Sequence, residues 1–264
     1  MSLNSITIIG GGNLGKAIAE GLIASKYVKP NQITVTKRNT STLDYLKKQA
    51  VKISSDNKEA VKNASIILLC VKPFQAKEIV KEISSNLNSK QIIVSVVSGI
   101  NIDELENEIG KKITIFRAMP NTAVAIKQSM TCMCYKNANA SQIKIVENLF
   151  NTLGKTITID EKLMDASTVL GACGTAFAMR YIRANIQAGI EIGFDARTAS
   201  IIAAQTVKGA AQLLIENNSH PEEEIDKVTT PKGVTITGLN QMEHNGLSSS
   251  IIKGITEAYK KMNP

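Results

Sequence analysis

Hydrophobic residues in the first 160 positions follow two patterns that alternate along the chain. Continuous apolar runs, typical of parallel strands buried on both faces, are separated by segments with helical spacing of three and four residues. The strand-like runs span residues 6–9, 33–36, 51–53, 66–71, 92–97, 113–116, 130–134 and 156–159. The helical segments between them include residues 43–49, 57–62, 76–87, 102–109 and 143–153. This alternation predicts an α/β domain with a doubly wound sheet over residues 1–160.

The pattern changes after residue 163, where no strand-like run returns. Helical spacing predicts helices at residues 164–170, 176–192, 196–217 and 249–261. Their apolar residues cover more than one side of each helix, and about 100 residues offer only a modest core of their own. We therefore expect residues 161–264 to form an all-α domain that buries its surface against a second subunit. Packing against the first domain alone is the alternative. No flexible linker marks the boundary.

The first strand-like run leads directly into a glycine-rich turn and then a helix. Gly10, Gly12 and Gly15 have G-x-G-x-x-G spacing, with Asn13 and Leu14 between the last two. In such a turn the glycines allow a tight bend, close approach of a pyrophosphate, and close packing of the helix on the strand. The unpaired N–H groups of the first helical turn favour a phosphate. The arrangement predicts a Rossmann-type dinucleotide site.

Two further features indicate which nucleotide binds and where. The second strand ends in Lys37, Arg38 and Asn39, and no carboxylate follows until Asp44. Because an Asp or Glu here binds the ribose of NAD and an Arg accommodates the 2′-phosphate of NADP, we favour NADP, with NADPH preferred and NADH as a second donor. A solvated loop is the alternative interpretation. Residues 71–73 should border the cofactor, since ligands lie outside the carboxyl ends of parallel strands.

The composition fits a globular enzyme better than a nucleic-acid-binding or membrane protein. The net charge is +8, but the lysines are dispersed and only 4% of residues are aromatic, so no basic, aromatic-rich surface is predicted. No apolar run approaches the roughly 20 residues that span a bilayer. The first six residues lack the basic start of a signal peptide, and we expect a cytoplasmic protein.

The cysteines and histidines predict no metal site. Cys132 and Cys134 are two residues apart, and no second pair completes a ligand set with them. We expect all four cysteines, which include Cys70 and Cys173, to be reduced core residues.

The loop at residues 226–239 combines hydroxyl side chains, a proline and a glycine before a helical start. Small hydroxyl residues such as Thr229, Thr230 and Thr235 can cap that helix. They can equally hold a small carboxylate beside the helix N–H groups. The composition of the loop favours neither interpretation.

Together these segments make the chain resemble the pyrroline-5-carboxylate reductases. The resemblance runs almost from end to end, and the order and spacing of its motifs are specific. The motifs are I-G-G-G-N-L-G at 9–15, V-K-P at 71–73, R-A-M-P-N-T at 117–122, D-E-K-L-M-D-A at 160–166, A-A-Q-T-V-K-G-A-A at 203–211 and V-T-T-P-K-G-V-T-I-T-G-L at 228–239.

The resemblance implies an oxidoreductase of proline biosynthesis that transfers a hydride from NAD(P)H to 1-pyrroline-5-carboxylate. It implies homodimers, in some members assembled into decamers. The cofactor residues that it implies are Gly10, Gly12, Asn13, Leu14, Gly15, Lys37, Arg38, Asn39, Asn57, Val71, Lys72, Pro73, Ser98 and Gly99. The implied substrate residues are Thr230, Gly233, Val234 and Thr235, with the Thr235 hydroxyl reaching the ring nitrogen as the catalytic group.

The chain departs from the family pattern at several positions. Residues 171–176 read G-A-C-G-T-A where S-G-S-G-P-A is usual, and Lys232 replaces a glycine. Ala123 replaces a proline, and Phe74 replaces a residue that is commonly polar. Two alternatives are a β-hydroxyacid dehydrogenase-like or related imine reductase and a non-catalytic nucleotide-binding regulator. The former places a catalytic lysine on a long helix between the domains, whereas residues 163–192 contain no lysine.

Overall fold

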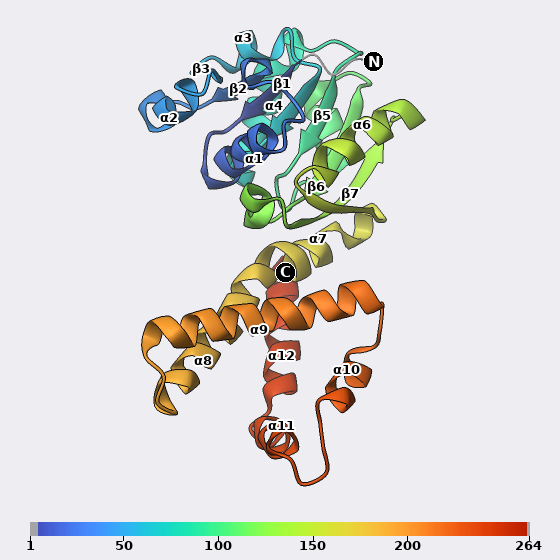
Figure 1. The fold of residues 1–264 in the computed structure, drawn as a ribbon. Helices are drawn as coiled ribbons and strands as arrows, with labels where there is room; N and C mark the ends of the chain where they lie inside the picture. The colour runs from blue at the N-terminus through green and yellow to red at the C-terminus, as the bar shows by residue number, and fades with distance from the viewer. Residues whose placement is uncertain (1–4, 263–264) are drawn as a thin grey trace. The chain divides into compact units, whose positions relative to one another are not determined.

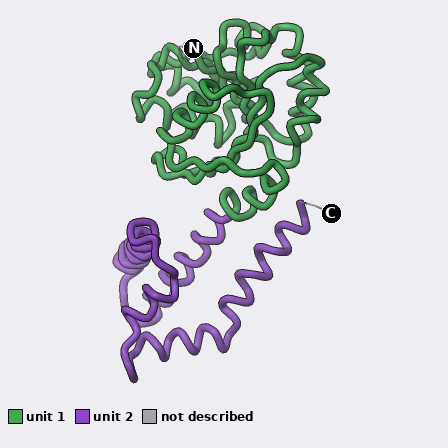
Figure 2. Tube along the Cα trace, turned by 90° about the vertical axis from the view of Figure 1, so that its right-hand side faces the viewer, with its two compact units in different colours: residues 1–173 green, residues 174–264 purple. Residues whose placement is uncertain are grey.

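The computed structural model describes residues 5–262 and divides into two compact units, Met1–Cys173 and Gly174–Pro264. Figure 1 shows the elements of each unit, and Figure 2 shows the two units in different colours. Residues 1–4, on which part of the cytoplasmic expectation rests, lie outside the described residues. Within residues 5–262, no helix combines the length and the apolar character needed to cross a membrane.

The first unit is built on an eight-stranded sheet with the order β3-β2-β1-β4-β5-β6-β7-β8. Neighbouring strands are parallel except for β6 and β7, which pair antiparallel. The strands are β1 (Ile6–Ile9), β2 (Ile33–Thr36), β3 (Lys52–Ser54), β4 (Ile66–Leu69), β5 (Ile92–Ser95), β6 (Thr114–Met119), β7 (Ser129–Lys136) and β8 (Gly154–Thr158). The predicted doubly wound sheet is confirmed.

Helices cover both faces of this sheet because successive strand side chains point to opposite faces. One core cluster joins Ile6 and Ile8 of β1 to residues of α1 and α6, and the other joins Ile9 to residues of α3, α4 and α5. The helices of the unit are α1 (Asn13–Ala24), α2 (Asp44–Lys47), α3 (Asn57–Val61), α4 (Pro73–Ile83), α5 (Ile102–Ile109), α6 (Ala140–Asn151) and α7 (Met164–Ser167). Short 3-10 helices are η1 (Pro30–Gln32), η2 (Thr40–Leu43), η3 (Ser84–Asn86), η4 (Thr122–Ile126) and η5 (Glu161–Leu163).

Some helix boundaries differ from the prediction for local reasons. α4 begins at Pro73, three residues earlier than expected, because proline is well suited to the first helical turn. The helix predicted at residues 164–170 is shorter, since α7 ends at Ser167 and a π-helix, η6 (Thr168–Cys173), follows. Hydrophobic spacing predicts that a segment is helical, but it does not distinguish π from α hydrogen bonding.

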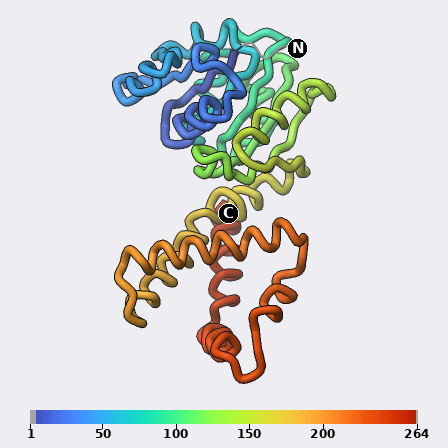
Figure 3. Tube along the Cα trace, viewed as in Figure 1, coloured from blue at the N-terminus to red at the C-terminus, as the bar shows by residue number. Residues whose placement is uncertain are grey.

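The regular elements of the second unit, over its described residues 174–262, are all helices. They are α8 (Gly174–Glu191), α9 (Ala196–Asn217), α10 (Pro221–Lys227), α11 (Val234–His244) and α12 (Leu247–Met262). α8 and α9 pack on each other and lie side by side in Figure 3, and α9 spans the predicted range of 196–217. The short helix α10 had not been predicted.

The helical unit leaves most of its apolar side chains uncovered. Ala199 and Ala203 are its buried hydrophobic residues among those described. Large exposed side chains include Met179, Ile192, Ile201, Ile202, Leu213, Ile215 and Ile252. Soluble monomers seldom expose this much clustered apolar surface, so the unit has the character of a subunit interface.

Candidate cofactor and substrate site

At Gly10 and Gly15, the turn between β1 and α1 has no room for a side chain. Gly10 has a φ of +106°, and a β-carbon on it would lie 2.3 Å from the carbonyl oxygen of Cys70. A β-carbon on Gly15 would lie 2.1 Å from the carbonyl oxygen of Gly10. The first glycine therefore allows the turn beside β4, and the third allows α1 to approach the strand.

Gly12 is different, because a β-carbon there would meet nothing within 4 Å. It is the N-cap of α1, no side chain caps the helix, and no acidic residue occupies its first turn. The first N–H groups of α1 therefore face open space beside the positive end of the helix dipole. Asn13 is exposed and Leu14 is half-buried in this turn. The arrangement fits the pyrophosphate of a dinucleotide.

The strand order reverses at β1, and the ends of β4 and β5 lie beside the glycine turn. Such a reversal creates a crevice outside the carboxyl ends of the strands. The Cys70 N–H donates to the carbonyl of Ile9 at 2.7 Å, which places residues 71–73 next to Gly10. Lys72 is the exposed N-cap of α4, and Pro73 is the first residue of that helix.

Residues 98–99 follow β5 at the same edge. The Val96 N–H donates to the carbonyl of Leu69 at 3.1 Å, so the end of β5 continues beside the end of β4. Gly99 is exposed and has a φ of +71°, and Ser98 is half-buried. The sheet therefore brings three of the predicted cofactor segments, widely separated in sequence, to one edge.

The end of β2 carries the residues expected near the adenosine ribose. Lys37 Nζ donates to Thr42 Oγ1 at 2.7 Å, whereas the Arg38 side chain is exposed. Asn39 caps η2 by accepting a hydrogen bond from the Ser41 N–H at 3.1 Å. The Arg38 side chain is therefore available to a bound nucleotide, whereas the Asn39 side chain is already hydrogen-bonded within its own turn.

Asn57 lies beside the same strand although it is far away in sequence. The hydroxyl of Thr36, the last residue of β2, donates to Asn57 Oδ1 at 2.6 Å. The Asn57 amide in turn donates to Glu82 at 3.4 Å. These contacts position Asn57 at the carboxyl end of β2, near Lys37 and Arg38.

The threonine-rich loop belongs to the second unit and ends at the start of α11. Its last residues form a tight turn, in which the Gly233 N–H donates to the carbonyl of Thr230 at 2.9 Å. A β-carbon on Gly233 would lie 2.5 Å from Thr230 Oγ1, so this position requires glycine. Lys232 is exposed and has a φ of +59°, a conformation that glycine would adopt more easily.

The N-terminus of α11 is open to a ligand. Gly233 is its N-cap, no side chain caps the helix, and its first turn contains no acidic residue. Among the described residues of this chain, the hydroxyls of Thr230 and Thr235 have no hydrogen-bond partner, whereas Thr229 and Thr237 donate to the carbonyls of Ile225 and Gly233. The loop thus retains two free hydroxyls and free helix N–H groups, the donors that a carboxylate requires.

The cysteines are all free thiols, but they are not all core residues. Cys134 is buried, and burial raises the pKa of its thiol to about 11. Cys70 and Cys132 are half-buried, whereas Cys173 is exposed. The expectation of a core position is therefore wrong for Cys173. This residue is the last of the π-helix, and its side chain is exposed. No group of three or more potential metal-ligating residues occurs among those the structure describes.

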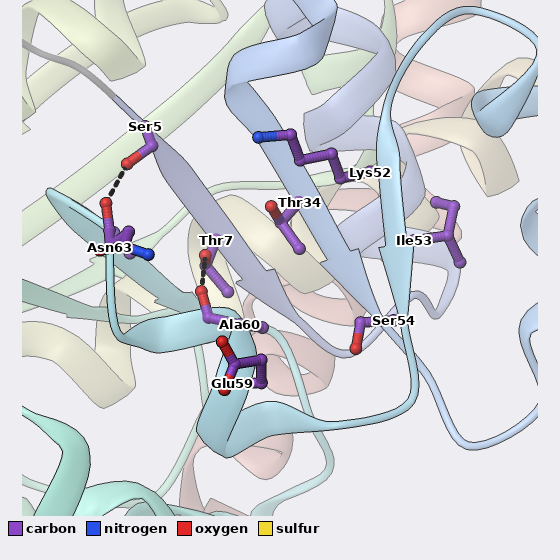
Figure 4. Close-up of a pocket in the computed structure, with 10 residues that line it drawn as sticks. Ser5, Thr7, Thr34, Lys52, Ile53, Ser54, Glu59, Ala60 and Asn63 are labelled. Carbon is purple, nitrogen blue, oxygen red and sulfur yellow. Dashed lines mark hydrogen bonds between the residues drawn. The ribbon is translucent and has the colours of Figure 1, made fainter.

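A cavity of about 260 Å³ lies on the face of β1, β2 and β3 beside α3 (Figure 4). Ser5, Thr7, Thr34, Lys52 and Ser54 are among the residues that line it. The hydroxyl of Thr7 donates to the carbonyl of Ala60 at 2.8 Å, and that of Ser5 donates to the carbonyl of Asn63. None of the predicted site residues lines this cavity, so it is separate from the glycine turn.

Sequence reasoning missed a buried cation in this unit. Arg117 of β6 is 4% exposed, and its guanidinium contacts Glu161 at 3.1 Å and Asp165 at 3.4 Å. The signal was present in the motif at residues 117–122, because an arginine inside an apolar strand must be paired when it is buried.

Two family models match separate parts of the chain. The model described as pyrroline-5-carboxylate reductase dimerisation matches residues 161–263. The model described as NADP oxidoreductase, coenzyme F420-dependent, matches residues 5–99.

Similar proteins cover nearly the whole chain. Pyrroline-5-carboxylate reductase 2 of Dictyostelium discoideum is 44% identical and covers 97% of this chain and 91% of its own length. Pyrroline-5-carboxylate reductase 1 of that organism is 47% identical over 98% of this chain, which spans only 49% of that longer relative.

Solved structures agree with these relatives. The pyrroline carboxylate reductase of Plasmodium falciparum with NADP bound has a TM-score of 0.91 at 26% identity, and it covers 99% of this chain and 98% of its own. A 3-hydroxyisobutyrate dehydrogenase of Mycobacterium tuberculosis reaches a TM-score of 0.54 at 11% identity, which shows a shared fold alone. With its glycine turn, its threonine loop and relatives similar over almost its full length, the chain belongs to the pyrroline-5-carboxylate reductase family.

Proposed function

We propose that this protein reduces 1-pyrroline-5-carboxylate to L-proline with a reduced nicotinamide dinucleotide. The observation that carries the proposal is the 44% identity, over nearly all of both chains, to a pyrroline-5-carboxylate reductase. The reaction needs a dinucleotide site and a carboxylate site, and the chain offers an open helix N-terminus for each, those of α1 and α11.

The first unit binds the dinucleotide in this proposal. The N–H groups at the start of α1 hold the pyrophosphate, and the backbone at residues 71–73 and 98–99 lines the same edge of the sheet. Lys37, Arg38, Asn39 and Asn57 surround the adenosine end. The bound nicotinamide supplies the hydride.

The threonine loop binds the substrate. The N–H groups of Val234 and Thr235 and the Thr230 hydroxyl donate to the carboxylate, and Gly233, whose own N–H is held by the Thr230 carbonyl, lines the site as the N-cap of α11. The Thr235 hydroxyl contacts the ring nitrogen and keeps its proton in place. A protonated imine is already electrophilic at carbon, so the hydride adds to the C=N carbon, the π electrons move to nitrogen and a secondary amine results. The remaining task of the protein is orientation and exclusion of water, which explains why no catalytic His or Cys is needed.

NADPH is the preferred donor in this proposal, because two cations and no carboxylate follow β2. The exposed Arg38 is the residue available for a 2′-phosphate. Arg38→Ala should lower the ratio of kcat/KM for NADPH to kcat/KM for NADH by about tenfold or more, since a charge-assisted hydrogen bond contributes about 1.5–3 kcal/mol. Steady-state kinetics with both donors would measure the ratio, with Lys29→Ala as a surface control. An unchanged ratio would assign the 2′-phosphate to other residues.

The working assembly in this proposal is a homodimer formed through the helical unit, with decamers built from dimers. The exposed apolar residues of α8, α9 and α12 and the match to a dimerisation model support it.

Oxidation of NADPH with 1-pyrroline-5-carboxylate tests the proposed function. A saturable rate that yields proline is the expected result, and a homologous six-membered imine serves as the comparison substrate. A higher kcat/KM for the six-membered ring would identify a related imine reductase instead. Binding of NADPH without turnover of either imine would favour a nucleotide-binding regulator.

A further inference from the structure

Thr36, the last residue of β2, makes hydrogen bonds to two parts of the predicted dinucleotide site. Its backbone carbonyl accepts from the N–H of Gly10 at 3.1 Å and from that of Gly11 at 2.8 Å. Its hydroxyl donates to Asn57 Oδ1 at 2.6 Å. One residue therefore holds the glycine turn with its main chain and the first residue of α3 with its side chain.

The partners of the Asn57 side chain determine which way its amide faces. A carboxylate accepts hydrogen bonds and donates none, so the amide atom 3.4 Å from Glu82 Oε2 is the nitrogen Nδ2. The amide oxygen then faces Thr36, whose hydroxyl is the donor. The reverse orientation would place the amide oxygen against the Glu82 carboxylate, which is unfavourable because both groups are acceptors.

This orientation leaves one Asn57 N–H available to a ligand. Nδ2 carries two N–H groups, and among the described residues Glu82 is its one hydrogen-bond partner. Asn57 is half-buried and lies at the carboxyl end of β2, where the adenosine ribose of a dinucleotide is expected. The ribose oxygens and the oxygens of a 2′-phosphate are acceptors, so an amide N–H is a suitable partner for them.

Thr7 on the neighbouring strand β1 provides a structural comparison. Thr7 and Thr36 are each 1% exposed, and the Thr7 hydroxyl donates to the carbonyl of Ala60 in α3 at 2.8 Å (Figure 4). Both threonines attach α3 to the sheet. Thr7 does so through the main chain of the helix, whereas Thr36 contacts the side chain of a predicted cofactor residue. Attachment of the helix and orientation of the amide can therefore be separated by experiment.

We propose that Thr36 is a positioning residue for dinucleotide binding, because it orients the Asn57 amide so that an N–H is available to the adenosine ribose. The inference rests on the proposed function, in which Asn57 lies at the adenosine end of the cofactor. Thr36 is buried and acts through Asn57, without a contact of its own to the cofactor. An amide that is oriented before binding has less conformational freedom to lose when the ligand arrives.

Thr36→Val is the informative variant, because valine keeps the shape of threonine and removes the hydroxyl. We expect the Kd of NADPH to rise about three- to tenfold, the effect of one hydrogen bond between neutral groups. The Kd of 2′-phospho-ADP-ribose, which lacks the nicotinamide, should rise by the same factor. The KM for NADPH should follow its Kd, and kcat should change less than about twofold. Fluorescence titration, calorimetric titration and steady-state kinetics would measure these quantities.

Three further variants separate orientation of the amide from stability of the fold. Thr7→Val removes the matched buried hydroxyl, so it should lower stability comparably but leave the Kd of NADPH within about twofold of the wild type. Thr36→Ser keeps the donor and should restore most of the affinity. When Thr36→Val is added to Asn57→Ala, the Kd should rise no further, because the group that Thr36 orients is absent.

An unchanged Kd in folded Thr36→Val would overturn the proposal. A further rise on adding Thr36→Val to Asn57→Ala would also overturn it, because Thr36 would then act on another part of the site. If Thr36→Val does not fold, Asn57→Asp provides the test, since it keeps an acceptor for Thr36 but removes both amide N–H groups. It should weaken NADPH binding at least as much as Asn57→Ala, and wild-type affinity would refute a role for the amide.

The titrations contain no imine, so they separate this inference from the proposed function. A wild-type protein that binds NADPH but does not reduce 1-pyrroline-5-carboxylate would refute the proposed function. Equal effects of Thr36→Val and Thr7→Val on the Kd of NADPH would instead refute the specific role of Thr36.

Discussion

The role of several residues in this protein depends on the free space around one of their atoms, the Cα of a glycine or the hydroxyl of a threonine. The three glycines of the first turn share a motif, yet a β-carbon would meet backbone oxygen at Gly10 and Gly15 and open space at Gly12. Gly10 and Gly15 are therefore needed for folding, whereas Gly12 leaves room for a ligand that approaches the turn from outside. The threonine loop shows a similar difference between residues of one type. The hydroxyls of Thr230 and Thr235 have no partner among the described residues, whereas those of Thr229 and Thr237 donate to backbone carbonyls.

The glycine turn gives a paired prediction. Gly15→Ala should lower the free energy of unfolding by about 1–3 kcal/mol or more, because its β-carbon would overlap the Gly10 carbonyl. Gly12→Ala should leave stability nearly unchanged but raise the Kd of NADPH by about tenfold or more, the effect of losing a hydrogen bond to a charged group. Denaturant unfolding and fluorescence titration would measure the two quantities. Equal effects of both substitutions on stability would contradict this division.

Thr235 is the residue on which the proposed chemistry depends most. Thr235→Val keeps the shape of the side chain but removes the hydroxyl that contacts the ring nitrogen. We expect kcat to fall about ten- to a thousandfold, the range for loss of a positioned proton donor or polar contact. Thr237→Val, two residues along the same helix, is the control and should retain turnover. Full turnover in Thr235→Val would exclude the hydroxyl from the mechanism.

At the scale of elements, the ends of helices provide the proposed binding sites and connect neighbouring elements of the fold. α1 and α11 begin without a side-chain cap, and both are assigned to anions in the proposed function. Several helices without such a role are capped by side chains, as Asn101 caps α5 and Asn139 caps α6, although α2 and α7 also lack a side-chain cap. The difference is physically sensible, since a capping side chain would occupy the N–H groups that a ligand needs.

The contribution to stability of the contacts between α9 and α10 should depend on pH. Glu224 accepts hydrogen bonds from Lys227, Ser219 and Asn217, which lower its pKa from 4.5 to about 2. Because the folded pKa is depressed, the carboxylate contributes stability above about pH 4.5 that is lost as the pH falls toward 2. Glu224→Gln should therefore lower the Tm at pH 6 and have little effect near pH 2. Scanning calorimetry of both proteins across this range would test it, and a Tm difference independent of pH would contradict the assignment.

At the scale of the whole molecule, the two units differ in how completely they bury their apolar residues. The sheet of the first unit has a core cluster on each face, whereas the helical unit exposes isoleucines, leucines and methionines along α8, α9 and α12. A domain with this surface depends on a partner, so stability and subunit concentration should be linked.

The proposed dimer can be tested on α9. Ile201 is 62% exposed in the single chain, and Ile201→Glu should raise the dimer dissociation constant by about tenfold or more, because a charge would enter an apolar interface. Ser89→Glu adds the same charge at an exposed position of the first unit and serves as the control. Light scattering coupled to gel filtration would give the masses. A dimer that withstands Ile201→Glu would place the interface elsewhere.

Much of this protein can be predicted from local pattern. Continuous apolar runs predicted the strands, because a strand buried on both faces needs no polar positions, and the spacing of Gly10, Gly12 and Gly15 predicted the nucleotide turn. The bounds of α9 agreed with the prediction because a long helix provides many turns of periodic signal. These features depend on residues close together in sequence.

Long-range contacts decided the rest. The antiparallel pairing of β7, the π-helix at Thr168–Cys173 and the position of Asn57 beside Thr36 follow from which segments meet in space. The ion pairs of Arg117 join residues more than 40 positions apart. Periodicity reports the face a residue occupies, not the segment it contacts, so only the tertiary structure could show that one buried arginine holds the chain where it leaves the sheet.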